Sequence, residues 1–251
     1  MSLLANPQAL LLAILAVTVL GMSKGGFLSM SVLATPLLAL AMPPTTAVAM
    51  MLPVLMVQDL VGVWAFRKTW DGWCLAWTLP GGALGVALGT LFAASVSEQR
   101  MLLALGVVTL VFGLYRLWIE RGGRIAAPSN SPGWVGALFG TASGFTSQVA
   151  HAGAPPLQMW LGPRRLSHEA FIGTSGIFFA AVNWMKVPSY LMLGALNRET
   201  LEAAALLTPL AIATTLISIR VVRRFHPDRF YTMIHVLLVV LGTKLIWDGL
   251  A

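Results

Sequence analysis

Long apolar stretches separated by short polar connections run through the whole sequence. An α-helix needs about 20 apolar residues to cross the roughly 30 Å hydrocarbon core of a bilayer. Six stretches have that length, at about 45–66, 75–96, 100–119, 170–194, 200–220 and 230–250. We therefore predict an all-α, polytopic membrane protein in which these six stretches are transmembrane helices.

Two further apolar stretches do not fit a simple crossing. Residues 8–42 would form a helix of about 50 Å at 1.5 Å per residue, but Ser23-Lys24-Gly25-Gly26 interrupts them near the middle. Residues 133–162 are broken in the same way by the polar stretch Thr146–Gly153 and by Pro155-Pro156. We expect each to form a broken, re-entrant helical hairpin, although a first stretch that crosses intact, giving seven spans, is also allowed.

The second half of the chain resembles the first. A spacing of 129 residues superposes Pro80 on Pro209 and Arg100 on Arg229, and a spacing of 124 pairs Asp59 with Asn183. We therefore predict two inverted repeats, each of three transmembrane helices plus one hairpin. The first repeat covers residues 1–119, the second covers 132–251, and a polar linker at 120–131 joins them.

Charge is scarce, and its position indicates the topology. Only 10% of the residues are charged and the mean hydropathy is +0.81, which excludes a soluble globular domain. If both hairpins return to the side they enter, eleven Lys and Arg lie on the side of the linker and two on the other. The positive-inside rule then places the linker in the cytoplasm. We expect a multi-pass protein, with the lipid bilayer as its surroundings.

Composition removes several other classes of function. The Lys and Arg residues form no continuous basic stripe, which argues against a nucleic-acid partner. The single cysteine, Cys74, permits no intramolecular disulfide or cysteine-based metal site. There is no Gly-rich nucleotide-binding loop. We predict no metal, no cofactor and no built-in ATP motor, so that gradients or a partner would supply the energy. A homodimer is left open.

Polar residues at the two hairpin tips are the candidate binding site. Irregular backbone inside a membrane is tolerated where it lines a cavity, and helix N-termini and glycines suit a small anion. A lysine deep in an apolar stretch is costly and marks function, although Lys24 could instead snorkel to an interface. The candidate substrate-binding residues are Lys24, Gly25, Gly26, Gln58, Thr146, Ser147, Gly153, Thr174, Asn183 and Lys186.

Two titratable residues are candidates for proton coupling. Asp59 is the only acidic residue of its stretch, and an intramembrane carboxylate either relays protons or pairs with a cation. A salt bridge from Asp59 to Lys24 is the alternative to a relay. His151 could titrate near neutral pH, or it could be a structural histidine.

An enzymatic alternative rests on Ser147 and His151. They are four residues apart and would share a helix face, as in the Ser–His dyad of an intramembrane hydrolase. The sequence has no strained nucleophile turn, and a serine in a membrane helix more often bonds the backbone. We therefore do not expect an enzyme.

Several motifs resemble those of the TauE/SafE family of probable sulfite and organosulfonate exporters. They include Gly21–Phe27, Gln58-Asp59, Ala150–Gly153 and Asn183–Lys186, and they follow the family order over nearly the whole chain. The resemblance implies a multi-pass permease of the bacterial inner membrane that moves sulfite, thiosulfate, a C2 sulfonate such as sulfoacetate, or a related carboxylate. The glycine triplet typical of the family is here Lys24-Gly25-Gly26, so the substrate is open.

The expected function is a secondary transporter of a small anion, acting as an exporter by alternating access. An anion channel, or a membrane subunit without transport of its own, is the alternative.

Overall fold

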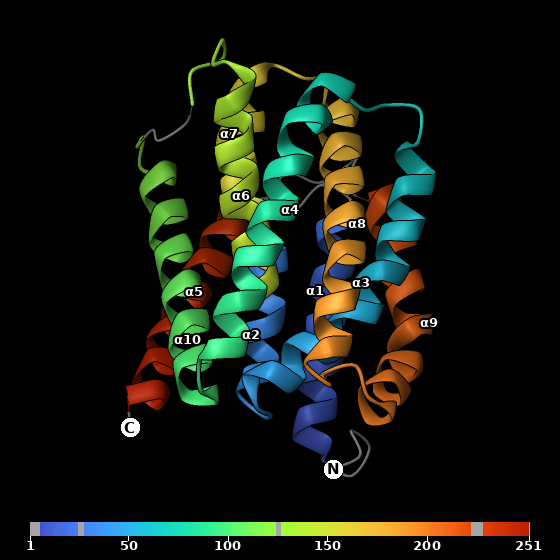
Figure 1. Ribbon diagram of the computed structural model, residues 1–251, viewed down its shortest axis with the longest axis vertical. Coiled ribbons are helices and arrows are strands. Elements are labelled where there is room, and N and C mark those ends of the chain that lie inside the picture. The colour runs from blue at the N-terminus through green and yellow to red at the C-terminus, as the bar shows by residue number, and fades with distance from the viewer. Residues whose placement is uncertain (1–5, 25–27, 124–126, 222–227, 251) are drawn as a thin grey trace.

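The computed structural model describes residues 6–24, 28–123, 127–221 and 228–250 (Figure 1). These residues form helices joined by short connections, without a β-strand. The long helices are α3 (Pro44–Phe66), α4 (Gly72–Ser95), α5 (Glu98–Glu120), α8 (His168–Met192), α9 (Arg198–Val221) and α10 (Asp228–Leu250). The prediction of an all-α, polytopic membrane protein is confirmed, and the six predicted stretches agree with these helices to within three residues at each end.

Local sequence signals set several of the helix starts. Asp71 accepts a hydrogen bond from the backbone N–H of Cys74 (2.7 Å) at the start of α4. Ser97 and Ser167 cap α5 and α8 in the same way. Such caps satisfy backbone donors that have no partner within the helix. Each of these three helices therefore begins at a residue that the sequence marks.

The first broken stretch returns to the side on which it begins. It consists of α1 (Pro7–Lys24), the 3₁₀ helix η2 (Leu28–Leu33) and α2 (Ala34–Ala39). Asn6 and Ala9 line one surface hollow together with Ala41 and Pro43, so the two ends of the stretch lie side by side. Seven of the described helices, α1 among them, are long and apolar enough to cross a membrane. In the structure α1 nevertheless ends inside the molecule, and the chain turns back (Figure 1).

The second broken stretch returns to the linker. It consists of α6 (Gly133–Ala150), α7 (Ala154–Leu161) and the 3₁₀ turn η3 (Gly162–Arg164). The Arg164 guanidinium donates to the backbone carbonyl of Ser131 in the linker (2.5 Å), and the N–H of Ala127 donates to the carbonyl of Met159 (3.0 Å). In Figure 1 this hairpin enters from the end opposite to the chain termini. Among the described residues, the six long helices therefore run between the two ends of the molecule, and the two hairpins enter from opposite ends.

Small residues bring the hairpins against the long helices. A Cβ added at Gly81 or Gly85 of α4 would collide with the carbonyl of Ala137 or Thr141 of α6. A Cβ at Gly144 of α6 would in turn collide with the carbonyl of Gly82. Glycine allows such backbone contact between membrane helices. This packing fixes the depth at which the tip of the second hairpin lies.

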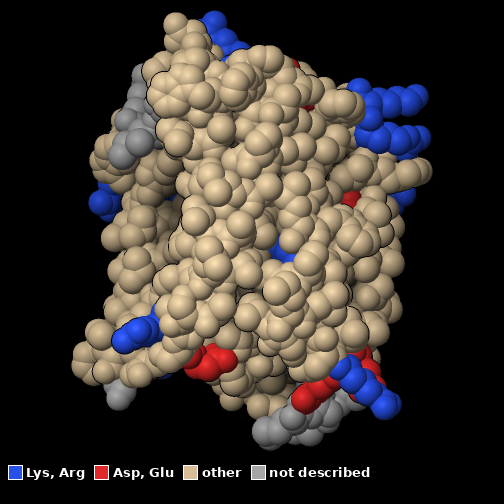
Figure 2. Space-filling view, in the orientation of Figure 1, with Lys and Arg blue, Asp and Glu red and all other residues tan. Residues whose placement is uncertain are grey.

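Apolar side chains cover the sides of the molecule and charged ones lie mainly at its two ends, as expected for a membrane protein. Large apolar side chains such as Leu60, Trp64 and Trp184 are exposed along the sides of the helices. Figure 2 shows an almost uncharged middle, more basic side chains at the end that bears the linker, and acidic ones mainly at the end that bears the termini. The end with the linker is called the linker face below, and the other end the terminus face.

Candidate functional site

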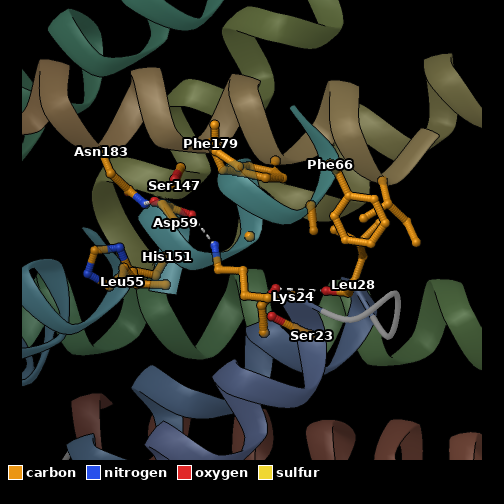
Figure 3. Close-up of a pocket in the computed structure, with 16 residues that line it drawn as sticks. Ser23, Lys24, Leu28, Leu55, Asp59, Phe66, Ser147, His151, Phe179 and Asn183 are labelled. Atoms are coloured by element: carbon orange, nitrogen blue, oxygen red, sulfur yellow. Dashed lines mark hydrogen bonds and ion pairs between the residues drawn. The ribbon is translucent and has the colours of Figure 1, made fainter. Parts of the chain in front are cut away.

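A cavity of about 40 Å³ lies where the tips of the two hairpins meet α3 and α8 (Figure 3). Its polar lining comes from both hairpins and from the two long helices: Lys24 at the end of α1, Asp59 of α3, Ser147 and His151 of the second hairpin, and Asn183 of α8. A water needs about 10–15 Å³ of such space, so the cavity holds a few waters or one small ion. It reaches toward the linker face, where Phe66 ends α3 and Ile172 begins the inner part of α8. We call it the central cavity.

An ion pair joins the first hairpin to α3 inside this cavity. The Lys24 ammonium donates to Asp59 Oδ1 at 2.5 Å, and the two side chains are 11% and 4% exposed. In Figure 3 the lysine chain points from the hairpin tip straight at the carboxylate. The snorkelling alternative for Lys24 does not describe this geometry, because its charge is directed into the protein. The salt bridge that the sequence left open for Asp59 is present.

The ion pair continues into a chain of polar groups on α8. Asn183 Nδ2 donates to Asp59 Oδ2 (2.6 Å), and Lys186 Nζ donates to Asn183 Oδ1 (2.9 Å). Lys186 is completely buried and also lies 3.0 Å from His151 Nδ1. Lys24 thus contacts the carboxylate directly, whereas Lys186 is linked to it only through Asn183. A lysine beside the cavity can offer an anion charge-assisted hydrogen bonds.

The His151 ring is held from both sides. Its Nε2 lies 2.8 Å from the backbone carbonyl of Val48, and a carbonyl can only accept. Nε2 therefore carries the hydrogen, and Nδ1 accepts from Lys186. The backbone of His151 has a φ of 52°, in the left-handed region, and its N–H closes the last turn of α6 on the Ser147 carbonyl. This turn directs the ring away from the axis of α6.

The hairpin tips differ from the sequence expectation of helix N-termini that present free N–H groups. Each hairpin brings one C-terminus to the tip, at Lys24 of α1 and at Ala150 of α6. The N-terminal turn of α7 lies at the tip of the second hairpin, beside Ala150, but it contains Pro155 and Pro156, which have no N–H to offer. A positive side chain is favourable at the C-terminal end of a helix dipole. The positive charge at this site therefore comes from the Lys24 side chain and not from backbone N–H groups at helix N-termini.

The structure brings some of the sequence candidates together and leaves others apart. Lys24, Ser147, Asn183, Asp59 and His151 line the central cavity, and Lys186 lies directly behind His151. Four others bond elsewhere: Gln58 donates to the Val17 carbonyl, Thr146 donates to a carbonyl of its own helix, the Thr174 hydroxyl accepts from the N–H of Asp71, and the Gly153 carbonyl accepts from the Ser143 hydroxyl. Gly25 and Gly26 lie outside the described residues.

Several lining residues were not singled out from the sequence. Gly62 lies one helical turn after Asp59 and faces the cavity, and nothing lies within 4 Å of a Cβ built there. Leu55, Phe66 and Phe179 supply apolar walls. A glycine at Asp59+3, on the same face of the helix, is a signal that the sequence did contain. The apolar residues carry no such signal in a chain this hydrophobic.

The geometry does not favour the Ser147–His151 dyad. Among the hydrogen bonds of the described residues, none joins the Ser147 hydroxyl to the His151 ring, and both ring nitrogens are engaged by Val48 and Lys186. A general base must reach the proton that it removes. The described part of the chain also contains no group of three or more His, Cys, Asp or Glu side chains that could hold a metal ion.

Comparison with protein families places the chain. The model of the family described as sulfite exporter TauE/SafE matches residues 9–245, which is nearly the whole length. Comparison with curated proteins and with solved structures gave no significant match. Seven helices of membrane length among the described residues, and a cavity between the hairpin tips that is lined by Lys24, Asp59 and Asn183, agree with a multi-pass membrane transporter. The protein therefore belongs to the TauE/SafE family of sulfite exporters.

Proposed function

We propose that the protein is a secondary carrier that exports a small oxyanion, with sulfite as the first candidate, across the bacterial inner membrane. Thiosulfate, a C2 sulfonate such as sulfoacetate, and a small carboxylate share the required chemistry. The observation that carries the proposal is the buried Lys24–Asp59 ion pair in a cavity large enough for one such ion. An inside-negative potential favours anion exit by about 2.3 kcal/mol per charge per 100 mV.

The binding step follows from competition for one ammonium. In the empty site Asp59 is the partner of Lys24. An entering oxyanion takes over part of that contact, and the Asn183 amide keeps its hydrogen bond to the displaced carboxylate. The Ser147 hydroxyl lies on the same cavity wall and offers the anion a donor. Charge-assisted hydrogen bonds of this kind are the strong ones in a protein interior.

Two features support a carrier over a channel. Among the described residues, His151 lines the central cavity with its ring held on Val48 and Lys186, and this ring lies across the way through the site. The hairpins also enter from opposite ends, as alternating access between inverted repeats requires.

The two-repeat division at 1–119, 120–131 and 132–251 is part of the proposal. Helix α1 packs on α9 as α6 packs on α4, and α3 packs on α9 as α8 packs on α4. Helices α3 and α8 contact each other, as do α5 and α10. These are the pairings expected if α1, α3, α4 and α5 correspond to α6, α8, α9 and α10.

Ligand-induced stabilisation tests the site without requiring transport. Purified protein is heated with sulfite, thiosulfate, sulfoacetate or acetate at constant ionic strength. A ligand that binds only the folded state at 100 times its Kd adds about 2.7 kcal/mol of stability. We expect at least one of the four anions to raise Tm, and we expect Asp59→Asn to bind that anion about tenfold more tightly, because the competing carboxylate is gone.

The paired control keeps the site neutral. In the double variant Lys24→Gln/Asp59→Asn both charges are removed together, so that no unpaired charge is buried. The increase in Tm should disappear in this variant. An increase that persists there, or weaker binding by Asp59→Asn, would place the anion elsewhere.

A further inference from the structure

A second, larger cavity lies on the opposite side of His151. It measures about 380 Å³ and is bounded by the start of α3, the end of α4, the start of α5 and the loop between α8 and α9. All of these boundaries belong to the terminus face. Val48, Gln148 and Tyr190 form its inner wall. We call it the outer cavity, and the anion site described above makes no use of it.

One layer of side chains separates the two cavities. His151 lines the central cavity and bonds the carbonyl of Val48, which lines the outer one. The ring of Tyr190, also in the outer wall, stacks on His151 with centroids 6.5 Å apart and an interplanar angle of 27°. Lys186 lies between the two cavities, is fully buried, and lines neither of them. The barrier between the two cavities is therefore the His151 ring, together with the groups that contact it on Val48, Lys186 and Tyr190.

Lys186, which holds the barrier, stands at the position on α8 that corresponds to Gly62 on α3. Gly62 follows Asp59 by three residues on α3, and Lys186 follows Asn183 by three residues on α8. At Gly62 the absence of a side chain leaves the central cavity open toward the linker face. At Lys186 a long side chain fills the corresponding space and holds Nδ1 of His151. The structure is thus open on one side of the polar chain and closed on the other.

We infer that the outer cavity is the other end of the path of the anion, and that Lys186 is the positioning residue that holds His151 across this path. The inference rests on the proposed carrier function, which it extends. Passage from the central to the outer cavity requires His151 to leave Val48, and its ring cannot turn while Lys186 donates to Nδ1. Lys186 acts through His151 and does not line the anion site.

Sidedness of cysteine labelling tests the barrier directly. In a Cys74→Ser background, Ser31→Cys reports on the central cavity and Ala93→Cys on the outer one; each position is half-buried and lines its cavity. With a membrane-impermeant thiol reagent, we expect Ser31→Cys to react from the linker face only and Ala93→Cys from the terminus face only. Adding Lys186→Met removes the donors but keeps the chain length, and should raise the rate of labelling from the opposite face at least tenfold.

The control is Lys244→Met, because Lys244 is an exposed lysine paired with Asp248 on α10. It should leave the sidedness unchanged. His151→Ala removes the ring itself, and should open the barrier even if Lys186→Met does not fold. Labelling of the parent from both faces, or unchanged sidedness in both Lys186→Met and His151→Ala, would overturn the inference. Because labelling needs no substrate, correct sidedness without anion flux would refute the carrier function alone.

Discussion

Replacement of Lys24 by Gln is expected to lower anion flux about 100-fold in proteoliposomes. The substitution removes the ammonium that meets the anion, and a lost charge-assisted contact in a desolvated site costs about 3 kcal/mol, which is about 100-fold in rate or affinity. The amide of Gln retains much of the side-chain length, so the cavity keeps its shape. The measurement is efflux of sulfite from loaded vesicles, compared with the parent protein at equal protein content.

Folding has to be separated from transport in this experiment. Lys24→Gln leaves Asp59 as an unpaired carboxylate that is 4% exposed, and breaking a buried pair costs about 3–5 kcal/mol. Lys24→Gln/Asp59→Asn avoids that cost and should fold well but transport equally poorly. Lys244→Gln makes the same chemical change at an exposed lysine and should transport normally. Normal flux in the folded double variant would remove Lys24 from the site.

Gly62→Leu should reduce transport to the level of empty vesicles while leaving the protein stable. A Cβ at this position meets nothing within 4 Å, so the backbone does not have to move. The rest of the leucine side chain then occupies a cavity of only about 40 Å³ and adds apolar contacts, which on burial are stabilising. Flux and Tm measured on the same preparation should therefore change in opposite directions, or flux alone should fall.

Gly162→Leu is the matched control for this substitution. Gly162 follows α7, a Cβ there also meets nothing within 4 Å, and it lies outside the lining of the central cavity. This variant should transport normally. Near-normal flux in Gly62→Leu would show that the anion does not pass beside Asp59.

Much of the fold follows from the length and order of apolar stretches. The six crossings were predictable because each exceeds about 20 apolar residues, and the caps at Asp71, Ser97 and Ser167 mark where three of them start. The hairpins were predictable as interruptions, at Lys24 and at Thr146–Gly153. Whether the first one crossed or returned was not, because α1 is long and apolar enough to do either. The structure shows the return, because both ends of the stretch line the same surface hollow.

The candidate site was likewise predictable only in part. Lys24, Asp59 and Asn183 could be selected because polar groups are rare and costly inside a membrane, and the structure joins them in one chain of hydrogen bonds. The hydrogen bond from His151 to the carbonyl of Val48 could not be predicted from the sequence, because every residue has a backbone carbonyl and nothing in the sequence marks which one accepts. Thr174 was chosen for its hydroxyl, but that hydroxyl accepts from the N–H of Asp71 at the end of the connection from α3 to α4. A hydroxyl alone does not reveal which partner it will find.

Anion efflux from proteoliposomes under an imposed membrane potential is the decisive test of whether this protein is an anion exporter. Vesicles loaded with sulfite, or with thiosulfate, sulfoacetate or acetate, are given a potassium diffusion potential that is negative or positive inside. We expect one of these anions to leave through the parent protein, at a rate that saturates with concentration and that the inside-negative potential accelerates. Folded protein that moves none of the four anions under either potential would contradict it.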